Sequence, residues 1–492
     1  MLLEPGTTCW RRETSGRAAL LVDMAAYFDA AMQAMRRAKR SIHLLNWAFE
    51  PETLFHPQPG AIGPADDRIA NFLKRLAGDN PQLDVRILCW QSAAPVAATQ
   101  HWFPIADRKT FAGSKVKFVL DGKLPMGASH HQKMIIVDDA IGFCGGGDIG
   151  PDRWDTPLHL DDDPRREVKK NSKKDFASRH EVMGVVEGAP ARALGDLFRE
   201  RWARCTGEVL PEPRKVRPAW PPGAVAQFRN IEVGLSRTLA AWRDYPEIRE
   251  VEALHLAAIR EARRCIYMEN QYFTSPLIAA ALAARLGEPN GPELVLIGTE
   301  QSPSYFDRMT MDGTRARFLA RLKRADKHGR FQAYSPVTTL GRIIIVHAKL
   351  TIIDDRLLRI GSANINNRSM GFDTECDMSF EATGRVGTGN RREIGRLRTR
   401  LLAHWLGCDE GAMEAAIRKA GGVGAGVEAL RNAGYARLRP IELKPLGPLG
   451  ELVADYHLGD PLGPADSWRP WGRKRASANA DRRGRAAAKA GA

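Results

Sequence analysis

One string of residues occurs twice in this chain, and its repetition limits what the chain can fold into. The string is His-x-Lys-x-x-x-x-Asp, and a turn of small residues begins seven positions after its Asp, at Gly145 and at Gly361. The two copies are His131, Lys133 and Asp138, and His347, Lys349 and Asp354. Matching residues lie 216 positions apart, a separation that predicts two copies of one folding unit.

The residues around the repeated string also match. An alanine-rich helical stretch runs into a short apolar strand at 34–49, and the same pattern returns at 258–273. A second strand-like segment at 83–90 is echoed at 293–299. Strands that alternate with helices predict an α/β fold. We therefore expect two similar domains, each a mixed β-sheet flanked by helices.

The proline-rich stretch 211–222 fits neither helix nor strand and predicts the junction between the halves. We expect one domain at 15–210, a second at 225–410 and a C-terminal extension at 411–492. The extension ends in Arg and Lys residues among Ala and Gly, which predicts a partly disordered basic tail. The charge-dense segment 156–178 lacks apolar periodicity and predicts a long surface loop beside the first motif.

Composition narrows the classes of protein to consider. Hydrophobic residues make up 43% and charged residues 27%, which is ordinary for a soluble globular protein. The sequence predicts neither a transmembrane segment nor a Sec-type signal, because no long stretch is free of charges and breakers. Seven scattered cysteines without a Cys-x-x-Cys pair suit a reducing interior. We expect a cytoplasmic or peripheral membrane protein, and secretion without a Sec-type signal stays open.

The paired motifs hold the groups that cleavage of a phosphodiester needs. Residues two apart on a strand share a face, so His and Lys of each motif are expected to point the same way. If two such faces meet across the domain interface, one pocket holds both histidines and both lysines. One His can attack phosphorus while the other protonates the departing alcohol. The two Lys and the amide of Asn364 can bind the nonbridging oxygens. The net charge of +15 agrees with an anionic partner, either phospholipid headgroups or nucleic acid.

A metal site built from the histidines is the competing interpretation. The acidic ligands that would complete it do not lie at helical or hairpin spacing. The chemistry of the paired motifs requires no metal, so we predict no metal ligand and no cofactor.

At these residues the chain resembles the phospholipase D superfamily, whose members place two such motifs at one active site between two similar α/β domains. The resemblance covers about residues 15–410. In five further strings the chain is similar to the phosphatidylcholine-type branch of the superfamily. These strings are 147–155, 179–181, 266–273, 364–370 and 373–375. The resemblance implies an active site on a pseudo-twofold interface.

The same resemblance implies roles for individual residues. His131 would be the nucleophile that becomes phosphohistidine, and His347 the general acid. The phosphate clamp would be Lys133, Lys349 and Asn364. The motif aspartates, Asp138 and Asp354, complete the catalytic set as supports rather than as direct chemical participants.

A second group of residues is expected to orient catalytic groups or bind substrate: Asp148, Asp155, Glu375 and Ser362. Glu375 and Asp155 are the candidates for holding an imidazole in its useful tautomer, as histidine catalysis usually requires. The first copy departs from the superfamily pattern, with Gly146 and Asp148 where Ser and Asn are usual. The clamp is therefore expected to be lopsided, with the second half supplying the amide.

Three reactions suit such a site. Hydrolysis of a glycerophospholipid to phosphatidic acid, with exchange of the headgroup alcohol, is favoured over a cardiolipin synthase-type phosphatidyl transfer. Enzymes of the latter kind commonly begin with membrane helices, which this sequence lacks. A superfamily nuclease is less favoured, and a non-enzymatic membrane-binding protein is poorly supported because both motifs keep His and Lys.

The expected partner is a phospholipid at a membrane surface, and nucleic acid is disfavoured. The internal duplication predicts a monomer that contains a pseudo-dimer. Basic residues would dock it on anionic bilayers, with Trp468 and Trp471 as candidate interfacial anchors.

Overall fold

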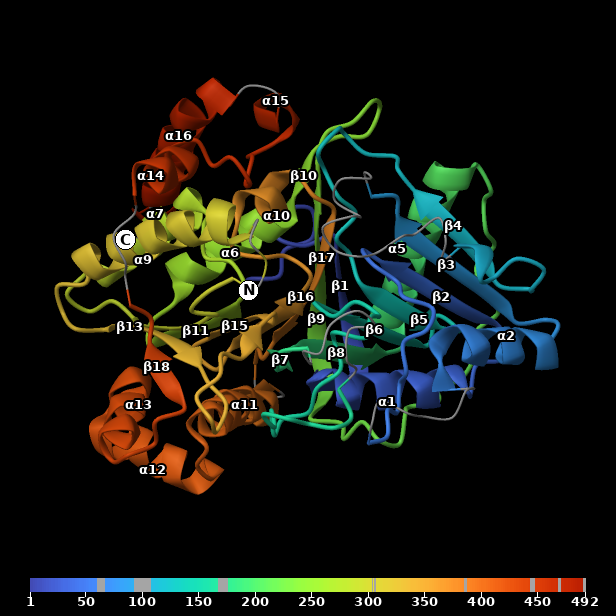
Figure 1. Ribbon diagram of the computed structural model, residues 1–492, viewed down its shortest axis with the longest axis horizontal. Coiled ribbons are helices and arrows are strands. Elements are labelled where there is room, and N and C mark those ends of the chain that lie inside the picture. Colours follow the sequence, from blue (N-terminus) through green and yellow to red (C-terminus); the bar gives the residue numbers. More distant parts are fainter. Residues whose placement is uncertain are drawn as a thin grey trace.

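The computed structural model describes residues 1–492 except 60–66, 93–107, 167–175, 303, 305–306, 385–386, 443–446, 468–469 and 490–492. Within the described residues, one mixed sheet of 16 strands runs through both halves of the chain, with helices on both of its faces (Figure 1). The predicted α/β class, a mixed sheet flanked by helices, is therefore confirmed.

The two halves contribute strands in the same spatial order. In the first half the order is β1 (Arg11–Val22), β8 (Val182–Glu187), β6 (Ile141–Gly145), β5 (Met134–Val137), β2 (Ser41–Asn46), β3 (Asp84–Trp90) and β4 (Lys117–Asp121). In the second half it is β9 (Phe228–Leu239), β17 (Glu375–Glu381), β16 (Leu357–Gly361), β15 (Lys349–Ile353), β11 (Cys265–Asn270), β12 (Glu293–Ile297) and β13 (Phe331–Pro336). Each pair of neighbours has the same relative direction in both series, parallel for the last two pairs and antiparallel for the others.

The halves join where β1 pairs with β9 in antiparallel register, from Arg11 opposite Leu235 to Ala18 opposite Phe228. Antiparallel pairing of two equivalent strands relates the halves by a local twofold axis. Between Thr206 and Phe228, where the proline-rich stretch lies, the chain has no helix or strand. Short strands β18 (Leu438–Pro440) and β10 (Ile248–Arg249) extend the sheet at β13 and β9.

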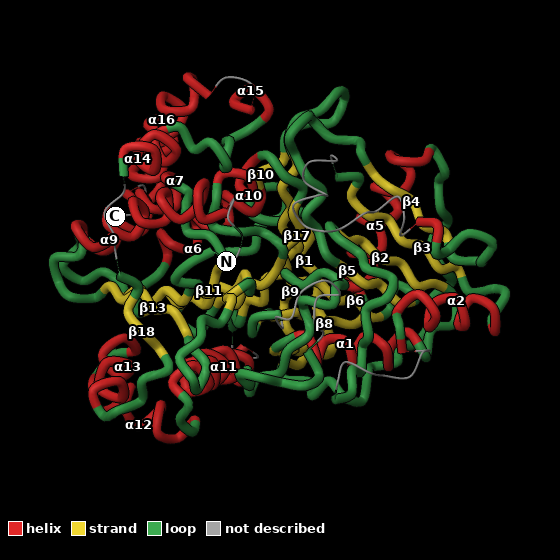
Figure 2. The backbone as a smooth tube through the Cα atoms, in the orientation of Figure 1, coloured by secondary structure: helices red, strands yellow, loops and turns green. Residues whose placement is uncertain are grey.

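Helices cover the sheet on both faces, as the red helices above and below the yellow strands in Figure 2 show. In the first half α1 (Met24–Met35) and α2 (Ile69–Asp79) pack on one face and α5 (Ala189–Thr206) on the other. In the second half α6 (Glu250–Glu261), α7 (Pro276–Leu286) and α9 (Gly313–Ala325) pack on one face and α11 (Gly387–Leu406) on the other. The remaining helices are η2 (Arg308–Asp312), α10 (Asn367–Gly371), α12 (Glu410–Ala420), α13 (Val423–Asn432), α14 (Pro448–Asp455), α15 (Pro464–Ser467) and α16 (Pro470–Lys489).

The strands that follow the motifs lie between these layers. All residues of Met134–Val137 and of Lys349–Ile353 are buried. Met134 and Ile136 contribute to the apolar core on one face, whereas Ile135 and Val137 contribute to the core on the other. This alternation explains why both segments read as continuous apolar runs in the sequence, and it holds the two motifs on a rigid base.

The C-terminal extension differs from its prediction. Residues 411–492 form several helices in the described part of the chain, so the prediction of a partly disordered tail is wrong there. Helix α16 packs along α7, where a β-carbon at Gly484 would lie 2.2 Å from the Leu277 carbonyl oxygen. Alanine and glycine, which suggested disorder, instead permit close helix contact, and Arg483 pairs with Glu252 at 2.7 Å. Trp468 and the side chain of Trp471 lie outside the described residues.

None of the helices among the described residues is both long enough and apolar enough to cross a bilayer.

Candidate active site

The segment that leads into each motif pairs with the opposite half of the chain. The His131 amide donates to the Thr374 carbonyl at 2.9 Å, and the His347 amide donates to the His180 carbonyl at 2.8 Å. The second contact continues the two-stranded sheet of β7 (Arg179–His180) and β14 (Ile345–Val346). These crossed pairings bring both motifs to the interface between the halves.

The sequence predicts that the motif histidines lie on the long strands, and the structure places them elsewhere. His131 and Lys133 precede β5, and His347 stands between β14 and β15. The reason is that the backbone at each His hydrogen-bonds to the opposite half instead of to the neighbouring strand of the sheet. Both histidines are mostly buried, with side chains 16% and 8% exposed.

A glutamate of the opposite half holds each motif histidine. His131 Nδ1 lies 3.0 Å from Glu375 Oε2, and His347 Nδ1 donates to Glu181 Oε2. A carboxylate can only accept, so Nδ1 carries hydrogen in both rings and Nε2 is left for the substrate. This contact supports the expectation that Glu375 orients an imidazole.

The motif lysines fold back over their own histidines. Lys133 Nζ donates to the His131 carbonyl at 2.7 Å and lies 3.3 Å from Asp148 Oδ2. Lys349 Nζ donates to the His347 carbonyl in the same way. The residues just beyond β2 and β11 complete the match, since Trp47 lies under the Lys133 ammonium and Gln271 Oε1 is 3.5 Å from Lys349 Nζ.

The electrostatics make the four side chains one site. Burial, then the charges of Lys133 and Lys349, hold the pKa of His131 well below its usual value. Burial also holds the pKa of His347 well below its usual value, and among the nearby positive charges Lys349 contributes most to this lowering. Burial lowers the pKa of Lys349 to about 7. Each lysine therefore acts on the histidines of both motifs, and an anion bound there would relieve the repulsion between them.

The two glutamates are not equivalent. Glu375 accepts the hydroxyls of Ser362 and Ser369 in addition to His131, and these hydroxyls oppose the rise in its pKa that burial causes. Glu181 Oε1 has no hydrogen-bond partner among the described residues, and burial raises the pKa of Glu181 to about 7. The His347–Glu181 pair is therefore better suited to hold an extra proton, and the His131–Glu375 pair to keep a carboxylate.

Gly146 explains this difference. It occupies the turn position that Ser362 occupies in the second half. A β-carbon at Gly146 would lie 2.5 Å from Glu181 Oε1 and 2.8 Å from the Cδ of Lys349. A serine in the first half would therefore displace one of these two side chains, and with Gly146 in place Glu181 lacks the hydroxyl that Glu375 receives.

The motif aspartates lie at the opposite end of β5 and β15 from the histidines. Asp138 accepts the backbone amides of residues 39–41 at 2.6–2.9 Å, and Asp354 accepts those of residues 263–265 in the same arrangement. They fasten the hairpin turns to the segments before β2 and β11. Of the catalytic set predicted from sequence, these two therefore lie outside the site, in the supporting position that the resemblance implied.

The turn residues differ as the sequence suggested. Asp148 accepts the amides of Trp47 and Ala48 at 3.0 and 3.1 Å, besides its contact with Lys133. Asn364 is buried, and its Oδ1 has no partner within the described part of the chain. A carboxylate at position 148 cannot donate to a phosphate oxygen, whereas the amide of Asn364 can. The lopsided clamp stays a prediction.

The predicted role of Asp155 beside a catalytic imidazole is wrong. Asp155 Oδ2 lies 3.0 Å from His159 Nδ1, and Glu181 occupies the place beside His347. The loop that carries Asp155 turns back on itself, so that His159 from the same loop lies beside Asp155. Sequence comparison of the halves could have found Glu181, because the strings 179–181 and 373–375 lead into the equivalent strands β8 and β17.

Comparisons with known proteins agree with this arrangement. A family model described as "Cardiolipin synthase, PLD-like domain" matches residues 255–387. "Phospholipase D A" of Dictyostelium discoideum is 24% identical over 75% of this chain and 33% of its own length. "Phospholipase D alpha 3" of Arabidopsis thaliana is 23% identical over 77% of this chain and 62% of its own length. The chain thus spans less than two thirds of these curated relatives.

Among solved structures, the phosphatidylserine synthase of Haemophilus influenzae Rd KW20 shares the fold, with a TM-score of 0.54, 13% identity and coverage of 94% of both chains. Fold and site together define a duplicated α/β protein that holds one His and one Lys from each half at a single interface. Residues 255–387 thus match a PLD-like domain, and about three quarters of the chain is similar to phospholipases D.

Proposed function

We propose that this protein is a phospholipase D, which cleaves the headgroup from a glycerophospholipid through a phosphohistidine and passes the phosphatidyl group to water or to another alcohol. The observation that carries the proposal is the crossed arrangement of the two motifs, in which each His is held at Nδ1 by a glutamate of the other half. This leaves both Nε2 atoms for the substrate, and the proposal is that they act at one phosphorus.

His131 is the proposed nucleophile. Its Nε2 bonds to phosphorus while the bond from phosphorus to the headgroup oxygen breaks, and positive charge develops on the ring. Glu375, whose two serine hydroxyls oppose the rise in its pKa that burial causes, stabilises that charge. Lys133, Lys349 and the Asn364 amide would bind the nonbridging oxygens.

His347 is the proposed general acid. Its Nε2 proton passes to the leaving oxygen, so the headgroup departs as a neutral alcohol. The proton is available because the bound phosphodiester offsets the lysine charges and because Glu181, with its raised pKa, shares a proton with the ring. The same Nε2 then takes a proton from water, whose oxygen attacks phosphorus and releases phosphatidic acid and free His131.

A lipid substrate is supported by the names of the curated relatives, which are phospholipases D. We infer that the chain acts as a monomer on a phospholipid at a membrane surface, in the cytoplasm or as a peripheral membrane protein. A cardiolipin synthase-type transfer is the second candidate, favoured by the description of the matching family model.

An alcohol-exchange assay tests these proposals. Phosphatidylcholine vesicles incubated with the protein and ethanol should yield phosphatidylethanol, and His131→Ala and His347→Ala should each abolish it. Phosphatidylglycerol vesicles should give phosphatidic acid if hydrolysis dominates and cardiolipin if transfer does. Cleavage of plasmid DNA without any lipid product would contradict the proposal and favour a nuclease.

A further inference from the structure

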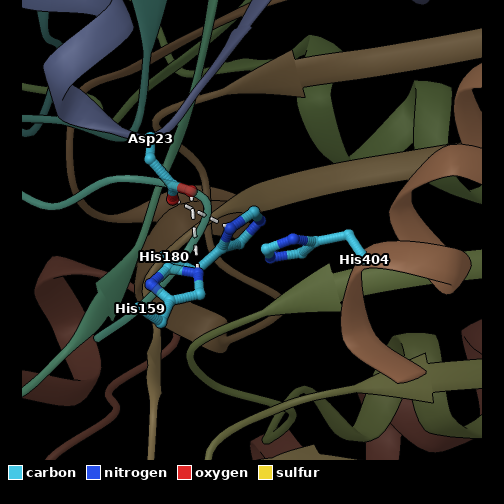
Figure 3. Close-up of side chains that lie close together, drawn as sticks. All are labelled: Asp23, His159, His180 and His404. Carbon is cyan, nitrogen blue, oxygen red and sulfur yellow. Dashed lines mark ion pairs between the residues drawn. The ribbon is translucent and has the colours of Figure 1, made fainter. Parts of the chain in front are cut away.

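Three histidines and one aspartate from distant parts of the chain meet beside the candidate active site. They are Asp23 before α1, His159 in the loop after β6, His180 on β7 and His404 on α11. Figure 3 shows the three rings gathered around the Asp23 carboxylate, with His404 reaching in from its helix. One potential ligand atom from each residue lies within 4.8 Å of every other, and Asp23, His159 and His180 are fully buried.

Each of these atoms lacks an ordinary hydrogen-bond partner. Asp23 Oδ2, His159 Nε2, His180 Nδ1 and His404 Nε2 are buried without one in the described part of the chain. His180 Nδ1 lies 3.0 Å from Asp23 Oδ1 and His159 Nε2 lies 3.6 Å from Asp23 Oδ2. Buried polar atoms are normally satisfied, and a single ion at the point where these four converge would be a partner common to all of them.

The outer nitrogens of two rings are fixed by carboxylates. His159 Nδ1 donates to Asp155 at 3.0 Å, and His180 Nε2 donates to Glu269 at 2.9 Å. Glu269 is itself held by Trp405 Nε1 at 2.9 Å and by the Tyr267 hydroxyl. Because a carboxylate only accepts, hydrogen sits on these outer nitrogens, and the inner nitrogens of neutral rings turn lone pairs toward the lone pairs of Asp23.

Such an arrangement needs a cation at its centre. Against the effect of burial, the charges of Asp23 and Glu269 raise the pKa of His180 to about 10, so a second proton on that ring supplies positive charge. That proton leaves His404 Nε2 without a partner among the described residues. A divalent metal ion accounts for all four atoms. Imidazole rings that bind a metal usually donate their other N–H to a carboxylate, as both of these rings do.

We propose that Asp23, His159, His180 and His404 form a tetrahedral site for a divalent transition-metal ion, with Zn²⁺ as the ion that the donor set suits best. Three imidazole nitrogens and one carboxylate oxygen are ordinary zinc ligands, at bond lengths of about 2.0–2.2 Å. Ligand atoms in that geometry lie about 3.3–3.5 Å apart, so a pair at the 4.8 Å limit would close by about 1.3–1.5 Å. With four protein ligands the site is closed, as structural zinc sites are.

The site would fasten the two halves together behind the general acid. Three ligands belong to the first half, and His404 belongs to the second. Asp23 Oδ1 accepts the Glu181 amide at 3.1 Å, and the Asp23 amide donates to the Glu181 carbonyl at 2.7 Å. The ligand His180 accepts the His347 amide through its carbonyl. The metal would therefore set the position of Glu181 and His347 without touching substrate. This proposal does not depend on the identity of the substrate.

Metal analysis of the purified full-length chain tests the site. Inductively coupled plasma mass spectrometry should find about one Zn²⁺ per chain after dialysis. Metal-free protein should bind Co²⁺ with the visible absorption of a tetrahedral complex and should regain thermal stability with added Zn²⁺. His159→Gln and His404→Gln should lose the metal. The matched control is His255→Gln, because His255 is also buried, has an Nε2 without a hydrogen-bond partner among the described residues and lies outside the cluster; this variant should keep the metal.

Two results would overturn the proposal. One is a parent protein that carries no stoichiometric metal and gains neither Co²⁺ absorption nor stability from added ions; the cluster would then be an ion pair of protonated rings. The other is metal retained equally in both cluster variants. If the variants do not fold, X-ray absorption on the parent decides, since a zinc shell without three imidazoles contradicts the site.

Discussion

Replacing Glu375 by Gln should separate the orientation of His131 from the rest of the site. The carboxylate accepts three donors, from Ser362, Ser369 and His131, and it is completely buried. Gln keeps the shape but has one oxygen and one NH₂ group. At least one of the three donors therefore loses its acceptor, and the NH₂ group facing His131 would favour the wrong tautomer.

The expected loss follows from the charge that develops on His131. Opposite unit charges about 4 Å apart interact by about 4 kcal/mol at an effective dielectric constant of about 20. Since the ring is only partly charged in the transition state, about 2–4 kcal/mol of barrier should be lost, which is roughly a 30- to 1000-fold fall in kcat. Headgroup release from phosphatidylcholine vesicles measures this directly.

Glu381→Gln is the matched control, because Glu381 is buried on the same strand, β17, but accepts the amides of Leu2 and Leu3 far from the histidines. It should lower stability and leave kcat within about threefold of the parent. If Glu375→Gln retained kcat within the same range while remaining folded, the reasoning that Glu375 stabilises the charged ring would be refuted.

Three further predictions concern the supports and the charges. Asp138→Ala should lower the free energy of unfolding by about 2–4 kcal/mol, measured by urea denaturation, because three backbone amides lose a buried acceptor; normal stability would contradict the fastening role. Gly146→Ser should cost about 1–3 kcal/mol of stability and lower kcat, because its β-carbon would displace Glu181 or Lys349. The value of kcat/KM should fall as pH rises through about 7, where Glu181 loses its proton and Lys349 loses its charge. In Glu181→Gln only the contribution of Lys349 to this fall should remain. A pH profile unchanged by the substitution would exclude Glu181 as a proton donor in the reaction.

Much of the fold was readable from the duplication. The matching segments 34–49 and 258–273 correspond to α1 with β2 and α6 with β11, and the apolar runs after each motif are buried strands. The tail was misread because Ala and Gly suit both a flexible chain and a helix that packs closely on another. The contact with α7 decides whether the segment is flexible or helical, and the composition of the segment does not reveal that contact.

The site divides in the same way. Short-range spacing in the two repeated strings is enough to identify His131, Lys133, His347 and Lys349. Their glutamates come from the opposite half, 244 residues from His131 and 166 residues from His347. Asp155 was predicted to hold a catalytic imidazole because it lies in a motif-like string, but its loop brings it to His159 instead.

By itself, the sequence determined that the chain is built twice from one α/β unit and that each unit carries a His and a Lys for phosphodiester chemistry. Periodicity and repetition are local properties, so a linear reading finds them. Only the tertiary structure decided which carboxylate holds which histidine, why a side chain at position 146 would displace Glu181 or Lys349, and that four residues from positions 23 to 404 meet at one buried point. Those outcomes depend on antiparallel pairing of β1 with β9 and on crossed contacts between the halves, which bring together atoms that no spacing along the chain relates.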